Sequence, residues 1–260
     1  MRIASFNING VKARLPALLE WLAAAAPDVV LMQEIKSVDE GFPREPIEDL
    51  GYNVETQGQK GFNGVAILSK RPIEDVTRGL PGAPEDEQSR WIEATISGEK
   101  GAIRVCGLYL PNGNPAPGPK YDYKLAWMER LHARVAELIA AEETALIAGD
   151  YNVIPQAEDA RHPENWLDDA LYMPETRAAY RQLLALGLTD AFRALNDAPL
   201  NYTFWDYQAG AWPKNNGIRI DHILLTPQAA DRLIACEIDR GPRDGVKPSD
   251  HTPIWADLEI

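Results

Sequence analysis

Cysteine is scarce in this sequence, and long apolar runs are absent. The 260 residues include two cysteines, Cys106 and Cys236, and each lies in an apolar, strand-like segment. Such a pair is more typical of buried free thiols than of a disulfide, so a reducing, cytoplasmic compartment is expected. No stretch approaches the roughly 18 apolar residues that cross a bilayer. The start of the chain is strand-like and already polar at Asn7, which is unlike a secretory signal.

Basic residues are also few relative to acidic ones. The chain has 26 Lys and Arg against 39 Asp and Glu, which gives a formal net charge of −13. Most nucleic-acid-binding domains are basic because phosphate backbones attract Lys and Arg. The acidity therefore argues against a simple nucleic-acid binder. Divalent cations bound to a carboxylate cluster, or basic side chains gathered on one face, would each reconcile it with a phosphate substrate.

The hydrophobic pattern predicts an α/β (α+β) fold in one domain spanning residues 1–260. Helical spacing is seen at Leu15–Leu22, at Met128–Ile139 and around Tyr180–Leu184. Many strands follow one another directly, which favours mixed or antiparallel sheets over a purely parallel one. Two stacked sheets flanked by helices suit the chain length. The expected strands are Ile3–Asn7, Val29–Met32, Tyr52–Thr56, Gly64–Ser69, Trp91–Ile96, Ile103–Leu110, Ala145–Ala148, Ile220–Thr226, Ala235–Asp239 and Ile254–Leu258.

Polar side chains stand where several of the apolar strands end. Asn7, Glu34 and the pair Asp150 and Asn152 each follow such a strand. If these strands are neighbours, a rigid sheet brings the side chains together. Oxygen ligands without a Cys/His cluster suit a hard cation such as Mg²⁺ or Mn²⁺. Taken singly, Glu34 is equally compatible with a solvated carboxylate, and Asp150 and Asn152 with an Asx turn.

A second group of polar residues lies near the end of the chain. Asp250 and His251 precede the last strand, and Asp221 lies in the strand before. A neighbouring carboxylate lets imidazole stay protonated near neutral pH and contact a phosphate oxygen. An isolated histidine is more often structural, and spacing alone does not show that Asp221 reaches His251. In a strand His222 points away from Asp221, so it is left out of the site.

Eight motifs together resemble the exonuclease III / AP endonuclease family of the endonuclease–exonuclease–phosphatase superfamily. They occur in the family order and span nearly the whole chain, so the set is specific although each motif alone is weak. The motifs are Ser5–Gly10, Leu31–Lys36, Gly58–Ala66, Leu108–Gly113, Ala148–Val153, Thr203–Tyr207, Ile218–Asp221 and Pro248–His251.

This resemblance implies a four-layer αββα sandwich, with two mixed β-sheets packed face to face and helices outside. It also implies a metal-dependent phosphodiesterase of base-excision repair that uses Mg²⁺ or Mn²⁺. Such an enzyme cuts double-stranded DNA on the 5′ side of abasic sites, or removes 3′ blocking groups and nucleotides. It is expected to act as a monomer.

The same resemblance implies roles for the catalytic and metal-binding residues. Asn7, Glu34 and Asp250 are expected at the metal, and Asp150 would activate or orient the attacking water. Asn152 would hold the nucleophile, while Asp150, Asn152 and His251 would serve a second metal position if one is used. The implied catalytic residues are Asp150, Asn152, His251, Asp221 and Tyr109.

On the substrate side, the resemblance implies a pocket walled by Phe204 and Trp205 that accepts an abasic sugar or a terminal nucleotide. The other expected substrate contacts are Asn112, Lys60, Arg219 and Lys12. Some relatives insert a bulky basic or Met side chain into the duplex. The corresponding loops, residues 112–115 and 207–210, have neither.

Two other hypotheses fit part of the pattern. A superfamily relative that hydrolyses phospholipid or inositol phosphate headgroups would share the metal Glu, the Gly-Asp-x-Asn and the Ser-Asp-His segments. The segments Gly58–Ala66 and Thr203–Tyr207 favour DNA instead. A catalytically inactive scaffold would have no need of the full polar set from Asn7 to His251.

Overall fold

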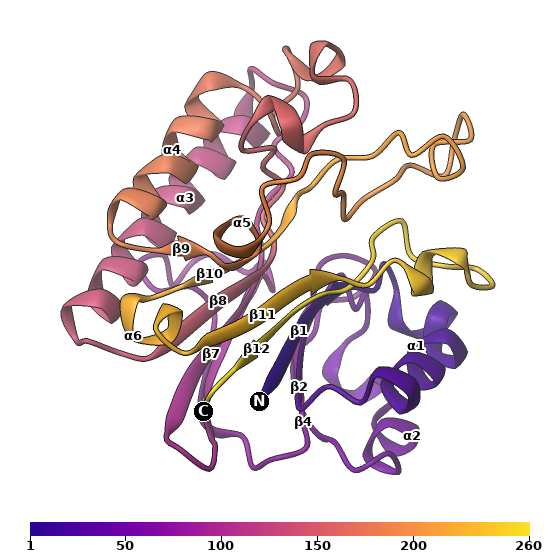
Figure 1. Cartoon of the computed structure of the whole chain (residues 1–260), viewed down its shortest axis with the longest axis vertical. Coiled ribbons are helices and arrows are strands. Elements are labelled where there is room, and N and C mark those ends of the chain that lie inside the picture. Colours follow the sequence, from indigo (N-terminus) through magenta and orange to yellow (C-terminus); the bar gives the residue numbers. More distant parts are fainter.

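Two mixed β-sheets of six strands each form the centre of the molecule (Figure 1), and the computed structural model describes all residues from 1 to 260. The first sheet has the order β11 (Leu233–Ile238), β12 (Ile254–Leu258), β1 (Arg2–Asn7), β2 (Val29–Gln33), β4 (Val65–Ser69) and β3 (Asn53–Gln57). The second has the order β5 (Glu74–Arg78), β6 (Trp91–Ser97), β7 (Ala102–Tyr109), β8 (Ala145–Asp150), β10 (Asp221–Leu225) and β9 (Thr189–Asp190).

Helices cover the outer face of each sheet, as Figure 1 shows for α1 on one side and for α3 and α4 on the other. The α-helices are α1 (Val11–Ala25), α2 (Arg44–Glu48), α3 (Pro119–Ala140), α4 (Pro174–Ala185), α5 (Ala191–Leu195) and α6 (Pro227–Ala230). Four short 3₁₀ turns are η1 (Asp39–Gly41), η2 (Ala157–Asp159), η3 (Pro163–Trp166) and η4 (Gly241–Asp244).

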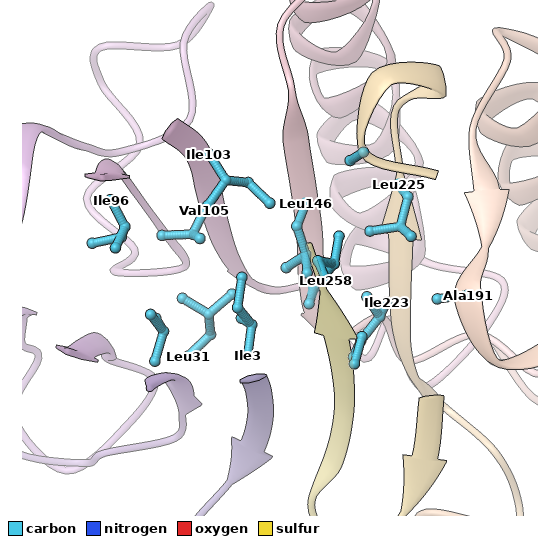
Figure 2. Packing of buried hydrophobic residues seen from close by; sticks show 14 of the residues in the cluster. Ile3, Leu31, Ile96, Ile103, Val105, Leu146, Ala191, Ile223, Leu225 and Leu258 are labelled. Atoms are coloured by element: carbon cyan, nitrogen blue, oxygen red, sulfur yellow. The ribbon is translucent and has the colours of Figure 1, made fainter. Parts of the chain in front are cut away.

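The largest apolar core, of 22 buried residues, lies between the two sheets. Figure 2 shows Ile3 and Leu31 of the first sheet close to Val105 and Leu146 of the second. Removing this much aliphatic surface from water is the main force that holds the sheets face to face.

Separate cores lie under the helices. Trp21 and Leu22 of α1 pack on Phe6 and other residues of the first sheet. Leu131 of α3 packs with Ile147 on the second sheet. The layers therefore run helix, sheet, sheet, helix, and the predicted αββα sandwich is confirmed.

The two-residue period of the strands decides which polar side chains face the gap between the sheets. In β1, Ile3 joins the core between the sheets while Phe6 faces α1, so Asn7 lies on the inner side. In β10, Ile223 and Leu225 face inward, so Asp221 does too. The same alternation in β8 places Asp150 on the inner face after Leu146 and Ala148.

The structure differs from the expected elements mainly where a segment is short or charged. Strand β5 reads Glu-Asp-Val-Thr-Arg and lies at the edge of its sheet, so it has no apolar alternation. Strand β9 is two residues long, and α2, α5 and α6 have five residues or fewer. Both cysteines are buried and free, as predicted. None of the helices has the length and apolar character that crossing a membrane requires.

Candidate active site

Three neighbouring strands of the second sheet bring polar residues to one level. Tyr109 pairs with Asp150 in the parallel ladder of β7 and β8, and Asp221 pairs with Asp150 in the antiparallel ladder of β10 and β8. The register of this sheet therefore places the three side chains in one row. Residues 109, 150 and 221 are far apart in the sequence, so only strand pairing brings them together.

The first sheet contributes Asn7 and Glu34 from the opposite side of the gap. Strands β1 and β2 are parallel neighbours, so their carboxyl ends lie together. The side-chain Nδ2 of Asn7 donates to Glu34 Oε1 at 2.9 Å and to Asp150 Oδ2 at 2.9 Å. Asp150 thus does not sit in the sheet of Asn7 and Glu34, and the predicted convergence occurs across two facing sheets.

His251 completes this cluster from the turn before β12. Its Nδ1 lies 2.7 Å from Asp221 Oδ2, and its Nε2 lies 3.6 Å from Asp150 Oδ2. The ring is 4% exposed, and its edge packs against Phe204 with the ring centroids 5.0 Å apart. Ser249 anchors the turn, because its Oγ donates to Asn7 O and accepts from His251 N. The pairing with Asp221, which spacing left open, is present.

Charges in the cluster shift one another's protonation. Burial by itself lowers the pKa of His251, but the carboxylates of Asp221 and Asp150 outweigh it and raise that pKa. Burial raises the pKa of Asp150, and the nearby Asp221 and Glu34 charges raise it further against the opposing effect of His251. Burial also raises the pKa of Glu34, but hydrogen bonds from Asn7 and Lys36 lower it overall. The structure therefore holds a cationic imidazole beside concentrated negative charge.

The donor set fits a hard divalent cation. Glu34, Asp150 and His251 each offer one ligand atom, and these atoms lie within 4.8 Å of one another. The two carboxylates are the kind of ligand that Mg²⁺ or Mn²⁺ prefers, and a cation there would offset the negative charge that, after burial, raises the pKa of Asp150. Nε2 of His251 is a ligand atom only in the neutral imidazole, so the protonated ring is a hydrogen-bond donor beside the cation and not one of its ligands. Nitrogen Nδ2 of Asn7 faces these carboxylates, and its Oδ1 accepts from Asn9 N. Asn7 therefore acts here as a donor to the ligands.

Two amide side chains lie at the rim of the cluster. Asn152 follows β8 with a φ of 47°, and its backbone N–H donates to Asp150 Oδ1 at 2.9 Å. Its Nδ2 donates to Leu110 O at 2.8 Å, and Asn112 Nδ2 lies 3.4 Å from its Oδ1. The loops after β7 and β8 thus join and present both amides beside the carboxylates.

Some expected site residues are not in the cluster. Asp250 accepts from Asn9 Nδ2 at 3.0 Å and is not among the grouped ligands. Trp205 is 0% exposed and donates to Asn215, so only Phe204 of the expected aromatic pair lines a cavity beside the site.

Arg219 is 1% exposed with its guanidinium on Asp159, Asp190 and His222, so it does not face a substrate. Its buried carboxylate partners make Arg219 part of the support beneath the site.

The expected basic contacts are exposed near the site. Lys12 lies in the first turn of α1, and Lys60 lies in a loop whose Asn63 and Gly64 carbonyls accept from the backbone of Lys36 and Ile35. Reasoning from the sequence gave Asn9 no role in the site and did not predict the pairing of Lys36 with Glu34. Lys36 Nζ lies 2.9 Å from Glu34 Oε2 and 2.5 Å from Asn9 Oδ1. Lys36 is two residues from Glu34 in the sequence, and Asn9 is two residues from Asn7, so this nearness was the available signal.

This arrangement suits the hydrolysis of a phosphodiester. A cationic imidazole and amide donors stabilise charge that builds on phosphate oxygens, and a bound divalent cation would add to this effect. A buried carboxylate of raised pKa is able to hold or deprotonate a water molecule.

Comparison with known proteins places the chain in a family. A model of the Endonuclease/Exonuclease/phosphatase family matches residues 4–251. Exodeoxyribonuclease III of Haemophilus influenzae is 37% identical over 270 residues, with all of both chains covered. The chain therefore belongs to this family, within its exonuclease III / AP endonuclease group.

Solved structures agree with this membership. An AP endonuclease from Archaeoglobus fulgidus is 38% identical with a TM-score of 0.94, and each chain is fully covered. A 3′ phosphatase from Neisseria bound to a product DNA hairpin is 35% identical with a TM-score of 0.95, also over both full chains. The chain is a nuclease of the DNA repair type. The predicted family, fold and enzyme class are confirmed.

Proposed function

We propose that this nuclease uses Mg²⁺ or Mn²⁺ to cut double-stranded DNA on the 5′ side of abasic sites and to remove 3′ blocking groups and nucleotides. The observation that carries the proposal is the cluster of Glu34, Asp150 and His251, joined across both sheets by Asn7. The relatives named as an AP endonuclease and a 3′ phosphatase support both kinds of DNA substrate. Because the site draws on residues from 7 to 251, we also propose that residues 1–260 act as one catalytic domain.

In this proposal Glu34 would hold the cation, with Asp150 as a ligand only where a second metal position is used, and the cation would supply a Lewis acid for the phosphate. Asp150 also orients the attacking water or removes its proton, since burial raises the pKa of its carboxyl group. His251, kept protonated by Asp221, donates from Nε2 to a nonbridging phosphate oxygen. Asp250 is assigned a supporting role near the leaving group through Asn9.

Other residues act on the substrate. Asn152 holds the nucleophile, and Asn112 contacts the phosphate from the adjoining loop. Burial and the Glu34 and Asp150 charges raise the pKa of Tyr109, so its hydroxyl stays protonated and serves as a donor to the phosphate or leaving oxygen. Phe204 walls the sugar pocket beside His251. The exposed Lys12 and Lys60 bind the DNA backbone.

The test uses duplexes that carry one abasic site or one 3′-phosphate, with Mg²⁺ or Mn²⁺ and with EDTA. We expect cleavage of both with either metal and none with EDTA. His251→Ala should lower kcat by about 10²- to 10³-fold, because it removes a donor that acts mainly in the transition state. Full activity in EDTA, or in His251→Ala, would contradict the proposal.

The same preparation should be tested on sphingomyelin and inositol phosphates. The relatives described above are nucleases, so we expect no turnover of these lipids and headgroups. Lipid turnover without DNA cleavage would replace the proposal with the headgroup hydrolase. The buried free thiols support the expected reducing, cytoplasmic location. We also propose that the enzyme acts as a monomer.

A further inference from the structure

Lys124 is a fully buried lysine beneath the active site. It lies near the start of α3 and is 0% exposed, which is rare for this residue type. Its Nζ donates to Asn112 O at 3.1 Å and to Asn152 O at 2.6 Å. Both acceptors are backbone carbonyls of the residues whose side chains stand at the rim of the site. Lysines commonly lie on the surface with a solvated charge, whereas Lys124 is buried in a helix with its amine on two backbone carbonyls.

Apart from Lys124, the two loops are joined directly after the strands end, where Leu110 N donates to Asp150 O at 2.9 Å. Asn152 Nδ2 donates to Leu110 O, and Asn112 Nδ2 reaches Asn152 Oδ1 at 3.4 Å. The longer of these contacts is at the limit of a hydrogen bond. The short contact from Lys124 to Asn152 O, together with the second to Asn112 O, joins the two backbones from below. Beyond the strand ends, the spacing of the two amides thus depends in part on the Lys124 amine.

The lysine stem has a defined path. A Cβ added to Gly113 would lie 2.7 Å from Lys124 Cδ and 3.3 Å from its Cβ, so the stem runs directly under this glycine. Gly113 also has a φ of 90°, which glycine adopts without strain. A neutral amine retains two N–H donors, which equals the number of carbonyl acceptors here. The contact set is therefore satisfied whether or not the amine is charged.

We propose that Lys124 is a positioning residue, which sets the distance and orientation of the Asn112 and Asn152 amides through their backbone carbonyls. The inference rests on the proposed function for the roles of these amides toward the nucleophile and the phosphate. Misplacement of catalytic groups by about 1 Å costs up to about 10²-fold in rate, so a support of this kind affects turnover without touching the substrate.

The first test replaces Lys124 with Met, which keeps the stem length and removes both donors. We expect kcat on an abasic duplex to fall by about 10- to 100-fold, with KM changed by less than about threefold. Lys124→Arg, which keeps several donors, should restore most of the loss. Arg134→Met is the matched control, because Arg134 is a cation of the same helix that pairs with Glu93 instead. Equal kcat in Lys124→Met and the wild type would overturn the proposal.

A double-mutant cycle tests whether Lys124 acts through Asn152. We expect the loss in the Lys124→Met/Asn152→Ala pair to be smaller than the product of the two single losses, because without the Asn152 amide Lys124 has only the Asn112 amide left to position. Losses that multiply would mean that Lys124 acts by another route. If Lys124→Met does not fold, the cycle is measured with Lys124→Gln, whose shorter chain falls short of the carbonyls.

A readout without turnover separates this inference from the proposed function. The side-chain amide resonances of Asn112 and Asn152 should move in Lys124→Met and stay in place in Arg134→Met. Unchanged resonances would overturn the positioning role even if the enzyme cuts DNA. If the wild type cuts no DNA, the proposed function fails, while shifted resonances would still show that Lys124 positions both amides.

Discussion

Asn7 is the residue through which the two sheets share one site. Its single amide nitrogen donates to carboxylates from both sheets, at 2.9 Å each. Both carboxylates are buried or nearly so, so the donor offsets part of their mutual repulsion. Losing it would let Glu34 and Asp150 separate or take up a proton.

Asn7→Ala should therefore lower kcat by about 10- to 100-fold and weaken the response to Mg²⁺. Asn53→Ala is a suitable control, because Asn53 donates only to the backbone of Ser69 and Arg71. The metal dependence of the initial rate on an abasic duplex is the measurement. An Asn7→Ala enzyme with wild-type rate and metal response would remove Asn7 from the site.

His222 shows how a neighbouring residue can be excluded from the site by one step of the strand. It faces away from the gap, with Nε2 on Val153 O and Nδ1 beside the Arg219 guanidinium. Burial and the Arg219 charge lower its pKa from 6.5 to about 4. The folded protein therefore keeps this imidazole neutral at a pH where the unfolded chain protonates it.

This shift predicts a loss of stability in acid. The unfolded state binds the extra proton between pH 6.5 and about 4, so stability is complete above this window and falls as the pH drops through it. The shift corresponds to about 3 kcal/mol of unfolding free energy. Urea unfolding at pH 7 and pH 4.5 should show a smaller loss in His222→Gln than in the wild type. Parallel losses in the two proteins would contradict the pKa assignment.

Among the elements, the pair β7 and β8 carries Tyr109 and Asp150 and depends on close backbone contact at Gly149. A Cβ at this position would lie 1.9 Å from Leu108 O, an atom of the neighbouring strand that cannot move aside. The glycine is therefore required by the strand pairing that precedes the catalytic aspartate.

Gly149→Ala should destabilise the protein by more than about 3 kcal/mol and abolish activity with it. Gly107→Ala in β7 is the matched control, since its added Cβ would meet Leu31 at 3.5 Å, an ordinary contact. Thermal unfolding of the two variants checks this. A Gly149→Ala protein with wild-type melting temperature would show that the strands can separate without cost.

At the level of the whole molecule, a net charge of −13 must be reconciled with a polyanionic substrate. The exposed Lys12 and Lys60 lie on segments that flank Glu34. Lys100 instead pairs with Glu259, the residue that follows β12. Attraction to DNA is therefore expected to be local to the face that carries the site.

DNA affinity should fall steeply with salt despite the acidic total. The slope of log K against log salt is about −0.9 for each phosphate neutralised. Lys12→Gln with Lys60→Gln should make the slope shallower by about 1 to 2, and Lys100→Gln should leave it unchanged. The measurement is a titration of duplex DNA in EDTA at several salt concentrations. A flat response in the wild type would show that this basic face does not bind DNA.

Much of the site follows from local pattern. Asn7, Glu34, Asp150 and Asn152 stand directly after apolar strands, and this position alone indicates polar groups held at strand ends. The exclusion of His222 follows from the two-residue period of a strand, which is a property of the backbone. The layered fold follows from the number of strands and from the faces that the helical patterns present.

Tertiary packing decided the rest, because it depends on contacts between residues far apart in the chain. The sequence determined which side chains end each strand, but not that Asp150 would meet Asn7 from a facing sheet. Nor does local pattern distinguish an arginine on the surface from Arg219, whose carboxylate partners lie 29 and 60 residues away. The burial of Lys124 under two loops has the same origin. Residues close in sequence largely determine secondary structure, whereas the burial of a side chain and its hydrogen-bonding partners depend on the whole fold.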